Sequence, residues 1–151
     1  MSKSFNFEDM KLIDRPEFGN MIPLELFRTI RLIGMYQSLP MKGKSTTSVI
    51  GKGIGESLPV KKVSDVLNIF EELKIGRPVI VEETEKKIII KMEECFCRGL
   101  PETGELVCDL EGAMLEGALK KATNKPVRVK ETKCNVNGDT HCEYECTWGT
   151  K

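Results

Sequence analysis

Near its C-terminus the chain reads Cys108-Asp-Leu-Glu-Gly-Ala-Met-Leu-Glu-Gly-Ala-Leu119, then Val127-Arg-Val-Lys-Glu-Thr-Lys-Cys134, and finally His141-Cys142-Glu-Tyr-Glu-Cys146. The first piece predicts a helix from Asp109 to about Ala122, with a capping residue at its start. The other two pieces flank a turn at 137–139 and predict a β-hairpin. Together they place three cysteines and a glutamate at one end of the fold.

These residue types indicate a metal site. Cys108 precedes a helix N-terminus, where the exposed N–H groups and the dipole favour the thiolate that a metal binds. Cys134 and Cys142 each lie four residues from Gly138, so a three-residue loop would set them opposite each other. Opposed side chains on one face have Cβ atoms about 4.5–5.5 Å apart, which is close enough to share a zinc ion.

Glu131 is the expected fourth ligand, and it requires an irregular strand. It lies three residues before Cys134, so a regular strand would point the two side chains to opposite faces unless a bulge intervenes. Other residues compete for this place: His141, Cys146, Cys95 and Cys97. Two alternatives need no metal: the cysteines are small buried apolar residues, or Cys134 and Cys142 form a disulfide.

The rest of the chain predicts helices and a second hairpin. Apolar residues recur at helical spacing from Ile22 to Leu39 and again from Val63 to Leu73. Residues 79–83 and 88–92 predict a hairpin, and the second strand is expected to continue through Cys95 and Cys97. These elements, with the C-terminal helix and hairpin, give an α+β fold in which an antiparallel sheet packs against helices.

Gly51 and Gly55 leave two structures open for their stretch. They share one face of a helix, together with a neighbouring face of Ile50, Ile54 and Leu58, which would let another backbone approach closely. Each glycine lowers helix propensity by roughly 1 kcal/mol, so a loop is an equal alternative. We expect one domain over residues 1–151, with residues 1–21 as an N-terminal extension that contributes to dimerisation.

Composition excludes several classes of function. The chain has 151 residues, 40% of them apolar, and 23 basic residues balance 23 acidic ones. A nucleic-acid or anionic-membrane surface would need clustered excess Lys and Arg. The sequence has neither an apolar run long enough to span a membrane nor a signal peptide, so we expect a cytoplasmic protein. In a reducing compartment, clustered thiols bind metals or act in redox chemistry more often than they form disulfides.

Residues 76–146 resemble the 4-vinyl reductase domain family. The resemblance rests on Glu94-Cys95, on Cys108 ahead of Glu111-Gly-Ala-Met-Leu-Glu-Gly, on Glu131-Thr-Lys-Cys134, and on Gly138-Asp139 ahead of Cys142. It implies a small-molecule-binding domain that forms homodimers and is related in fold to Golgi-transport tethering subunits. The glycines at positions 51 and 55 resemble the N-terminal half of the family more loosely.

The resemblance also implies a ligand set for zinc. In phenol-sensing activators that carry this domain, zinc is bound by Cys, Glu, Cys and Cys, a spacing matched here by Cys108, Glu131, Cys134 and Cys142. Four protein ligands leave no open position, so the ion would be structural. The aromatic-ligand His and Trp of those sensors have no counterpart, because His141 and Trp148 are both C-terminal.

These observations favour a zinc-containing binding domain for a small apolar, hydrocarbon-like molecule, acting as a sensor or carrier. The expected ligand-binding residues lie between the first helices and the sheet: Phe27, Ile30, Met35, Ile54 and Met92. One alternative is an enzyme, either a vinyl reductase with an external electron donor or a hydrolase with an open zinc and Glu131 as base. Another is an interaction module in which the helix over 22–39 dimerises or holds a partner.

Overall fold

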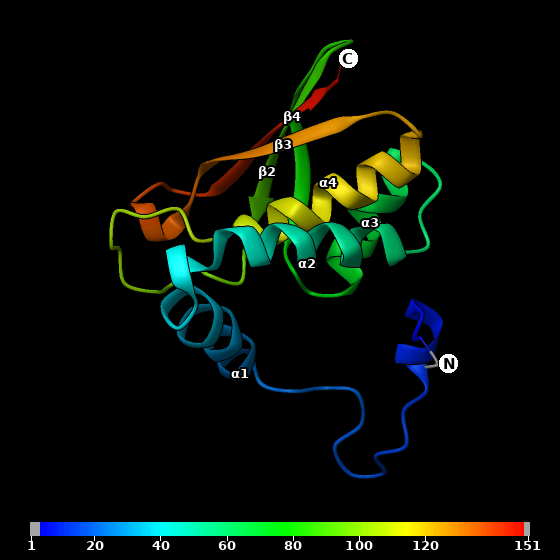
Figure 1. The fold of residues 1–151 in the computed structure, drawn as a ribbon, viewed down its shortest axis with the longest axis vertical. Coiled ribbons are helices and arrows are strands. Elements are labelled where there is room, and N and C mark those ends of the chain that lie inside the picture. The colour runs from blue at the N-terminus through cyan, green and yellow to red at the C-terminus, as the bar shows by residue number, and fades with distance from the viewer. Residues whose placement is uncertain (1–3, 150–151) are drawn as a thin grey trace.

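An antiparallel sheet forms one layer of the protein in this computed structural model, which describes residues 4–149. Its strands are β1 (Arg77–Glu83), β2 (Lys87–Glu93), β3 (Val127–Lys133) and β4 (Cys142–Trp148), in the spatial order β1-β2-β4-β3. The two hairpins therefore join through β2 and β4 into one sheet (Figure 1). Both expected hairpins and the antiparallel sheet are confirmed.

The buried face of the sheet comes from alternating positions on the two central strands. Three cross-strand pairs supply most of it: Ile88 with Cys146, Ile90 with Tyr144, and Met92 with Cys142. All six side chains are at most 2% exposed. Because side chains on a strand alternate between faces, the charged residues between them point away from the core.

Helices α2 (Lys44–Ser57), α3 (Val63–Glu72) and α4 (Asp109–Thr123) cover this buried face. α4 lies next to the sheet, α3 packs against α4 and β1, and α2 runs along the outer side of α4 (Figure 1). The α+β class is confirmed, as are the helices expected over 63–73 and 109–122.

Glycines allow α2 and α4 to approach each other closely. A Cβ atom added at Gly51 would lie 2.7 Å from the carbonyl oxygen of Leu110, and one at Gly55 would lie 2.6 Å from the backbone nitrogen of Ala118. Of the two structures left open for this stretch, the helix is the one present. The backbone contact supplies the packing gain that offsets the low helix propensity of glycine.

The helix expected over residues 22–39 is confirmed, but it changes geometry along its length. α1 (Leu24–Arg28) is an α-helix that runs directly into the π-helical segment η2 (Thr29–Gln37). Pro23 is the residue that precedes the first turn, where its missing N–H costs no hydrogen bond. The short 3-10 helix η3 (Pro40–Gly43) then leads into α2.

The N-terminal extension begins with a 3-10 helix, η1 (Phe7–Lys11), and continues as a long connection to α1 (Figure 1). Phe7 packs against the core, whereas Phe5, Leu12 and Phe18 are exposed. Residues 1–3 of the extension lie outside the described residues, and its part in dimerisation stays a prediction. No helix within residues 4–149 combines the length and apolar character that crossing a membrane requires.

The continuation of β2 through Cys95 and Cys97 is wrong. The strand ends at Glu93, and Glu94 has a positive φ of 51°. Two turn hydrogen bonds follow, from Arg98 N to the Cys95 carbonyl at 2.9 Å and from Leu100 N to the Cys97 carbonyl at 3.1 Å. The chain therefore folds back at this point, and both cysteines lie in a compact loop beneath the sheet.

The contact between α2 and α4 predicts opposite effects for two neighbouring glycines. Gly55→Ala should lower the free energy of unfolding by about 1–3 kcal/mol, because the new methyl group has no room against α4. Gly53→Ala is the matched control. A Cβ atom there meets nothing within 4 Å, so the change should stabilise the protein by up to about 1 kcal/mol. Urea denaturation measures both values, and equal effects at the two positions would contradict the packing.

Candidate metal centre

Five of the six cysteines meet at one point in the core, and all six are free thiols. Cys95 and Cys97 come from the loop after β2, and Cys108 is the residue that caps the N-terminus of α4. Cys134 follows β3, and Cys142 begins β4. The five side chains are at most 3% exposed. The disulfide considered for Cys134 and Cys142 is therefore wrong.

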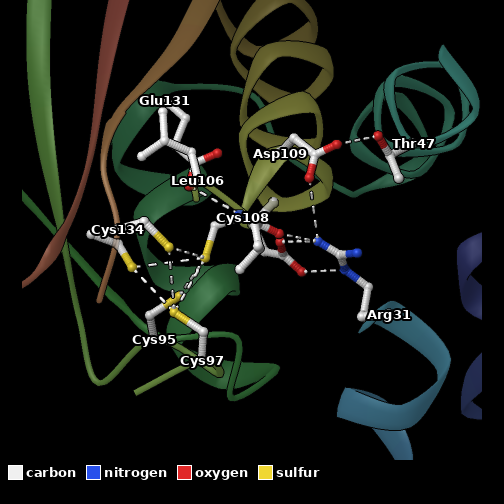
Figure 2. Close-up of polar contacts among 12 residues, drawn as sticks. Arg31, Thr47, Cys95, Cys97, Leu106, Cys108, Asp109, Glu131 and Cys134 are labelled. Atoms are coloured by element: carbon white, nitrogen blue, oxygen red, sulfur yellow. Dashed lines mark hydrogen bonds and ion pairs between the residues drawn. The ribbon is translucent and has the colours of Figure 1, made fainter. Parts of the chain in front are cut away.

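Cys108 is the centre of this thiol cluster (Figure 2). Its sulfur lies 3.3 Å from that of Cys97, 3.5 Å from Cys95, 3.6 Å from Cys134 and 3.8 Å from Cys142. A tetrahedral ion with bonds of about 2.3 Å to sulfur holds its ligand atoms about 3.8 Å apart. The sulfur separations thus match those of a thiolate-bound ion.

Glu131 also reaches the thiol cluster, for the reason expected from the sequence. The pairing of β3 with β4 shifts register between Glu131 and Lys133, which is the bulge that its approach requires. Its Oε2 atom accepts a hydrogen bond of 2.9 Å from the backbone N–H of Cys108. Glu131, Cys108 and Cys134 offer ligand atoms within 4.8 Å of one another. Burial raises the pKa of Glu131 to about 9, against the opposing effect of that hydrogen bond.

Hydrogen bonding among the thiols favours negative charge at two of them. Cys108 donates to Cys97, and this contact, with those from Cys134 and Cys142, lowers the pKa of Cys97. Contacts with Cys108 and Cys142 likewise lower the pKa of Cys134 to about 6. The pKa of Cys108 rises because it hydrogen-bonds to the neighbouring sulfurs. Thiolate is the form that binds a metal, so the thiol cluster is suited to a cation.

Two other competitors for the fourth position lie outside the thiol cluster. The Nε2 atom of His141 contacts Glu143 at 3.3 Å, and its Nδ1 atom contacts Thr140. Cys146 is four residues further along β4, where burial raises its pKa to about 12. Because a strand advances about 3.3 Å per residue, Cys146 is out of reach of Cys142.

Sequence reasoning missed two arginines that support the thiol cluster. Arg31 of η2 is 1% exposed; its Nε and Nη2 atoms donate to both carboxylate oxygens of Glu111 at 3.0 and 2.8 Å, and Nη2 also donates to the Val107 carbonyl at 3.0 Å (Figure 2). Burial alone would lower the pKa of Arg31, but the hydrogen bond and charge of Glu111 raise it above its usual value. Arg31 therefore fixes the residues on both sides of Cys108.

Arg28 fixes the loop that carries Cys95 and Cys97. Its Nε atom donates to the Phe96 carbonyl at 2.8 Å, and its Nη2 atom donates to the Arg98 carbonyl at 2.7 Å. The ring of Phe96 also lies edge-on to that of Phe27, with centroids 5.3 Å apart. A charged residue in an otherwise apolar helix was the available signal for both arginines.

The expected ligand-binding residues occupy different environments. Met92 is a core residue that pairs with Cys142 across the central strands, and Phe27 is half-buried against Phe96. Met35 is also half-buried, whereas Ile30 and Ile54 are 50% and 36% exposed. The role of these five residues stays a prediction.

A polar cavity of about 250 Å³ lies beside Glu131, between α2, α4 and β3. Its walls carry charged groups of both signs, and two ion pairs cross it: Lys44 with Asp109 at 3.7 Å and Lys52 with Glu116 at 3.2 Å. Thr47 also hydrogen-bonds to Asp109. Glu131 thus lies between the thiol cluster and a polar space.

The fold and the thiol cluster define an α+β domain with a candidate metal centre, and known proteins share this plan. The family model of the 4-vinyl reductase domain matches residues 88–147. Two uncharacterized proteins of Methanocaldococcus jannaschii, MJ0745 and MJ0150, are each 30% identical to this chain. Their alignments cover 96% and 92% of this chain, and 79% and 84% of the relatives. The chain belongs to the 4-vinyl reductase domain family.

Solved structures show the same fold at low sequence identity. A vinyl-4-reductase family protein from M. jannaschii aligns with a TM-score of 0.64 at 18% identity, covering 95% of this chain and 88% of that one. A trafficking protein particle complex subunit 3 from Naegleria fowleri, covalently bound to palmitic acid, aligns at 0.63 and 12%, covering 84% and 93%. The phenol-responsive sensory domain of the transcription activator PoxR, with phenol, aligns at 0.61 and 10%, covering 84% and 75%. The family and the fold expected from the sequence are confirmed.

The buried ion pair beside Cys108 predicts a strongly non-additive mutation cycle. Glu111→Leu should lower the free energy of unfolding by about 3–5 kcal/mol, because it leaves the Arg31 charge buried without its carboxylate. The double variant Arg31→Met/Glu111→Leu should recover most of that loss, since both charges are then absent. Urea denaturation measures the cycle. The exposed pair Glu56 and Lys120 is the control, with an expected coupling below about 1 kcal/mol. A double variant as unstable as Glu111→Leu would contradict this account.

Proposed function

We propose that this 4-vinyl reductase domain binds a small apolar molecule and that a structural zinc ion stabilises its C-terminal half. The observation that carries the zinc proposal is the convergence of buried thiols on Cys108, with sulfur separations of 3.3–3.8 Å. Zinc accepts sulfur and oxygen ligands tetrahedrally, and an enclosed site without an open position is structural.

The proposed centre is built on Cys108, Cys134 and Cys142, with Glu131 or a further cysteine in the fourth position. Each of the three cysteines comes from a different element, so a shared ion would tie the start of α4 to both strands of the C-terminal hairpin. Metal binding of this kind contributes directly to folding, because the unfolded chain has no preformed site.

The proposed ligand is a small apolar molecule bound near the N-terminal helix and α2. The ligand-binding residues are those expected from the sequence: Phe27, Ile30, Met35, Ile54 and Met92. Support comes from the fold itself, since similar structures contain phenol in one case and covalently bound palmitic acid in another. Apolar side chains with few polar partners are typical of such sites.

A homodimer completes the proposal, because it would cover apolar side chains that the single chain exposes. Leu26, Ile30 and Ile33 on the N-terminal helix are exposed, as are Val49 and Ile50 on α2. Exposed apolar patches mark interaction sites more often than free surface. A second copy at this face would shield these side chains and close the apolar site from water.

The zinc proposal predicts about one zinc ion per chain in protein purified without chelator, as measured by elemental analysis. Cys108→Ser should abolish binding. Chelation of the wild-type protein should lower Tm by about 10 °C or more, and added zinc should restore it. Cys146→Ser is the matched control: this buried cysteine lies outside the thiol cluster, so metal content should not change. Metal-free wild-type protein that binds no added zinc would refute the centre.

The ligand proposal predicts stabilisation by an apolar compound. Palmitate tests a chain-like ligand and phenol an aromatic one. At about 100-fold excess over Kd, a ligand should add about 2.7 kcal/mol, which raises Tm by about 5–10 °C. Ile30→Glu should remove this shift and reduce the dimer measured by light scattering. Val81→Glu is the control, because Val81 is similarly exposed but lies on β1. A monomer that neither compound stabilises would count against both parts of the proposal.

A further inference from the structure

We propose that Cys97, and not Glu131, supplies the fourth metal ligand. The ion is then held by four thiolates: Cys97, Cys108, Cys134 and Cys142. This inference rests on the proposed zinc centre and assigns its donor atoms, which differ from the Cys-Glu-Cys-Cys set that the family resemblance implies. It also gives a role to the loop after β2.

The sulfur atom of Cys97 has the position of a tetrahedral ligand. It lies 3.3 Å from Cys108, 3.4 Å from Cys142 and 3.9 Å from Cys134. Cys108 lies 3.6 Å from Cys134 and 3.8 Å from Cys142. Five edges of the four-sulfur set therefore lie near the separation of about 3.8 Å that bonds of about 2.3 Å require.

Glu131 is engaged elsewhere. Its carboxylate accepts the backbone N–H of Cys108 at 2.9 Å, and its side chain lines the polar cavity together with Lys44 and Thr47. In Figure 2 the sulfur atoms gather on one side of Cys108, and Glu131 lies on the other. It thus orients the backbone of a ligand residue, as groups around a metal's direct ligands commonly do.

The loop that carries Cys97 is held in place by the N-terminal helix. Arg28 donates to the carbonyl groups of Phe96 and Arg98, the two residues that flank Cys97. Arg31 lies over the Phe96 ring, 5.3 Å from its centroid. The thiol is therefore aimed at the centre of the cluster by contacts from a separate element.

Cys95 is the surplus thiol of the cluster. Its sulfur lies within 4.8 Å of those of Cys97, Cys108 and Cys142, but its one sulfur contact within 4.0 Å is with Cys108, at 3.5 Å. Cys134, by contrast, contacts both Cys97 and Cys108. Because four sulfurs fill a tetrahedral site, the fifth remains a thiol beside it.

Four thiolates also narrow the chemistry of the site. Sulfur ligands select zinc and other soft or borderline ions over magnesium and calcium, which prefer oxygen. Because the four cysteines are all 0% exposed, the ion would be closed to water and to substrate. The assignment thus makes the centre a purely structural one and excludes Glu131 as a base acting on a zinc-bound water.

X-ray absorption of the zinc-loaded wild-type protein tests the assignment without any substitution. Four sulfur scatterers at about 2.3 Å are expected. Three sulfurs with one oxygen at about 2.0–2.2 Å would overturn it and leave the zinc proposal intact. Protein that binds no zinc at all would remove the zinc proposal, and this assignment with it.

Cobalt substitution in matched variants gives a second test. The sulfur-to-cobalt charge-transfer absorption per bound ion should fall by about one quarter in Cys97→Ser, because four thiolates become three, and the zinc Kd should rise by more than about 100-fold. Glu131→Gln should keep the full intensity, since its amide oxygen still accepts the Cys108 N–H. Cys95→Ser should also keep it. Full intensity in Cys97→Ser, or a loss in either control, would overturn the assignment.

Discussion

The contact of buried sulfurs around Cys108 is the constraint on which the C-terminal half depends. Thiols attract each other only weakly, yet here five of them leave water together, and the pKa values of Cys97 and Cys134 are lowered. A negative charge in a dry interior costs several kcal/mol unless a cation or donors compensate it. The loop after β2, the start of α4 and both strands of the last hairpin all meet at this point, so their mutual order depends on that compensation.

The N-terminal helix enters the same structure through arginine. Arg31 places a buried positive charge beside Cys108 and joins η2 to α4 through Glu111. A buried ion pair contributes less to stability than its Coulomb attraction suggests, because desolvation opposes it. What it does provide is a fixed geometry, since a shifted helix would leave both charges unpaired. Arg28 extends that geometry to the loop of Cys97 by two backbone hydrogen bonds.

Much of the fold follows from local patterns, and the failures occur where two patterns look alike. Ile88, Ile90 and Met92 alternate as a strand, and the glutamate at 131 correctly required a bulge. Cys95 and Cys97 continue the same alternation, so sequence spacing cannot reveal that the left-handed conformation of Glu94 ends β2. Two glycines at 51 and 55 are ambiguous for a different reason. Their helix depends on a partner in α4 that is more than fifty residues away in sequence. The π-helical segment η2 is also invisible, because its apolar spacing resembles that of an α-helix over so short a length.

The position of Glu131 connects the dry centre with the polar cavity and shows why the two have separate roles. The thiols are closed to solvent, so chemistry on a bound molecule cannot occur among them. The cavity has the opposite character: it is crossed by ion pairs and open to water. The carboxyl of Glu131 belongs to the wall of the cavity and also accepts the N–H of Cys108. Any change that strengthens or removes that hydrogen bond at one end must alter the orientation of a sulfur ligand at the other. The structure therefore gives a small molecule a way to affect the stability of the centre without touching the metal itself.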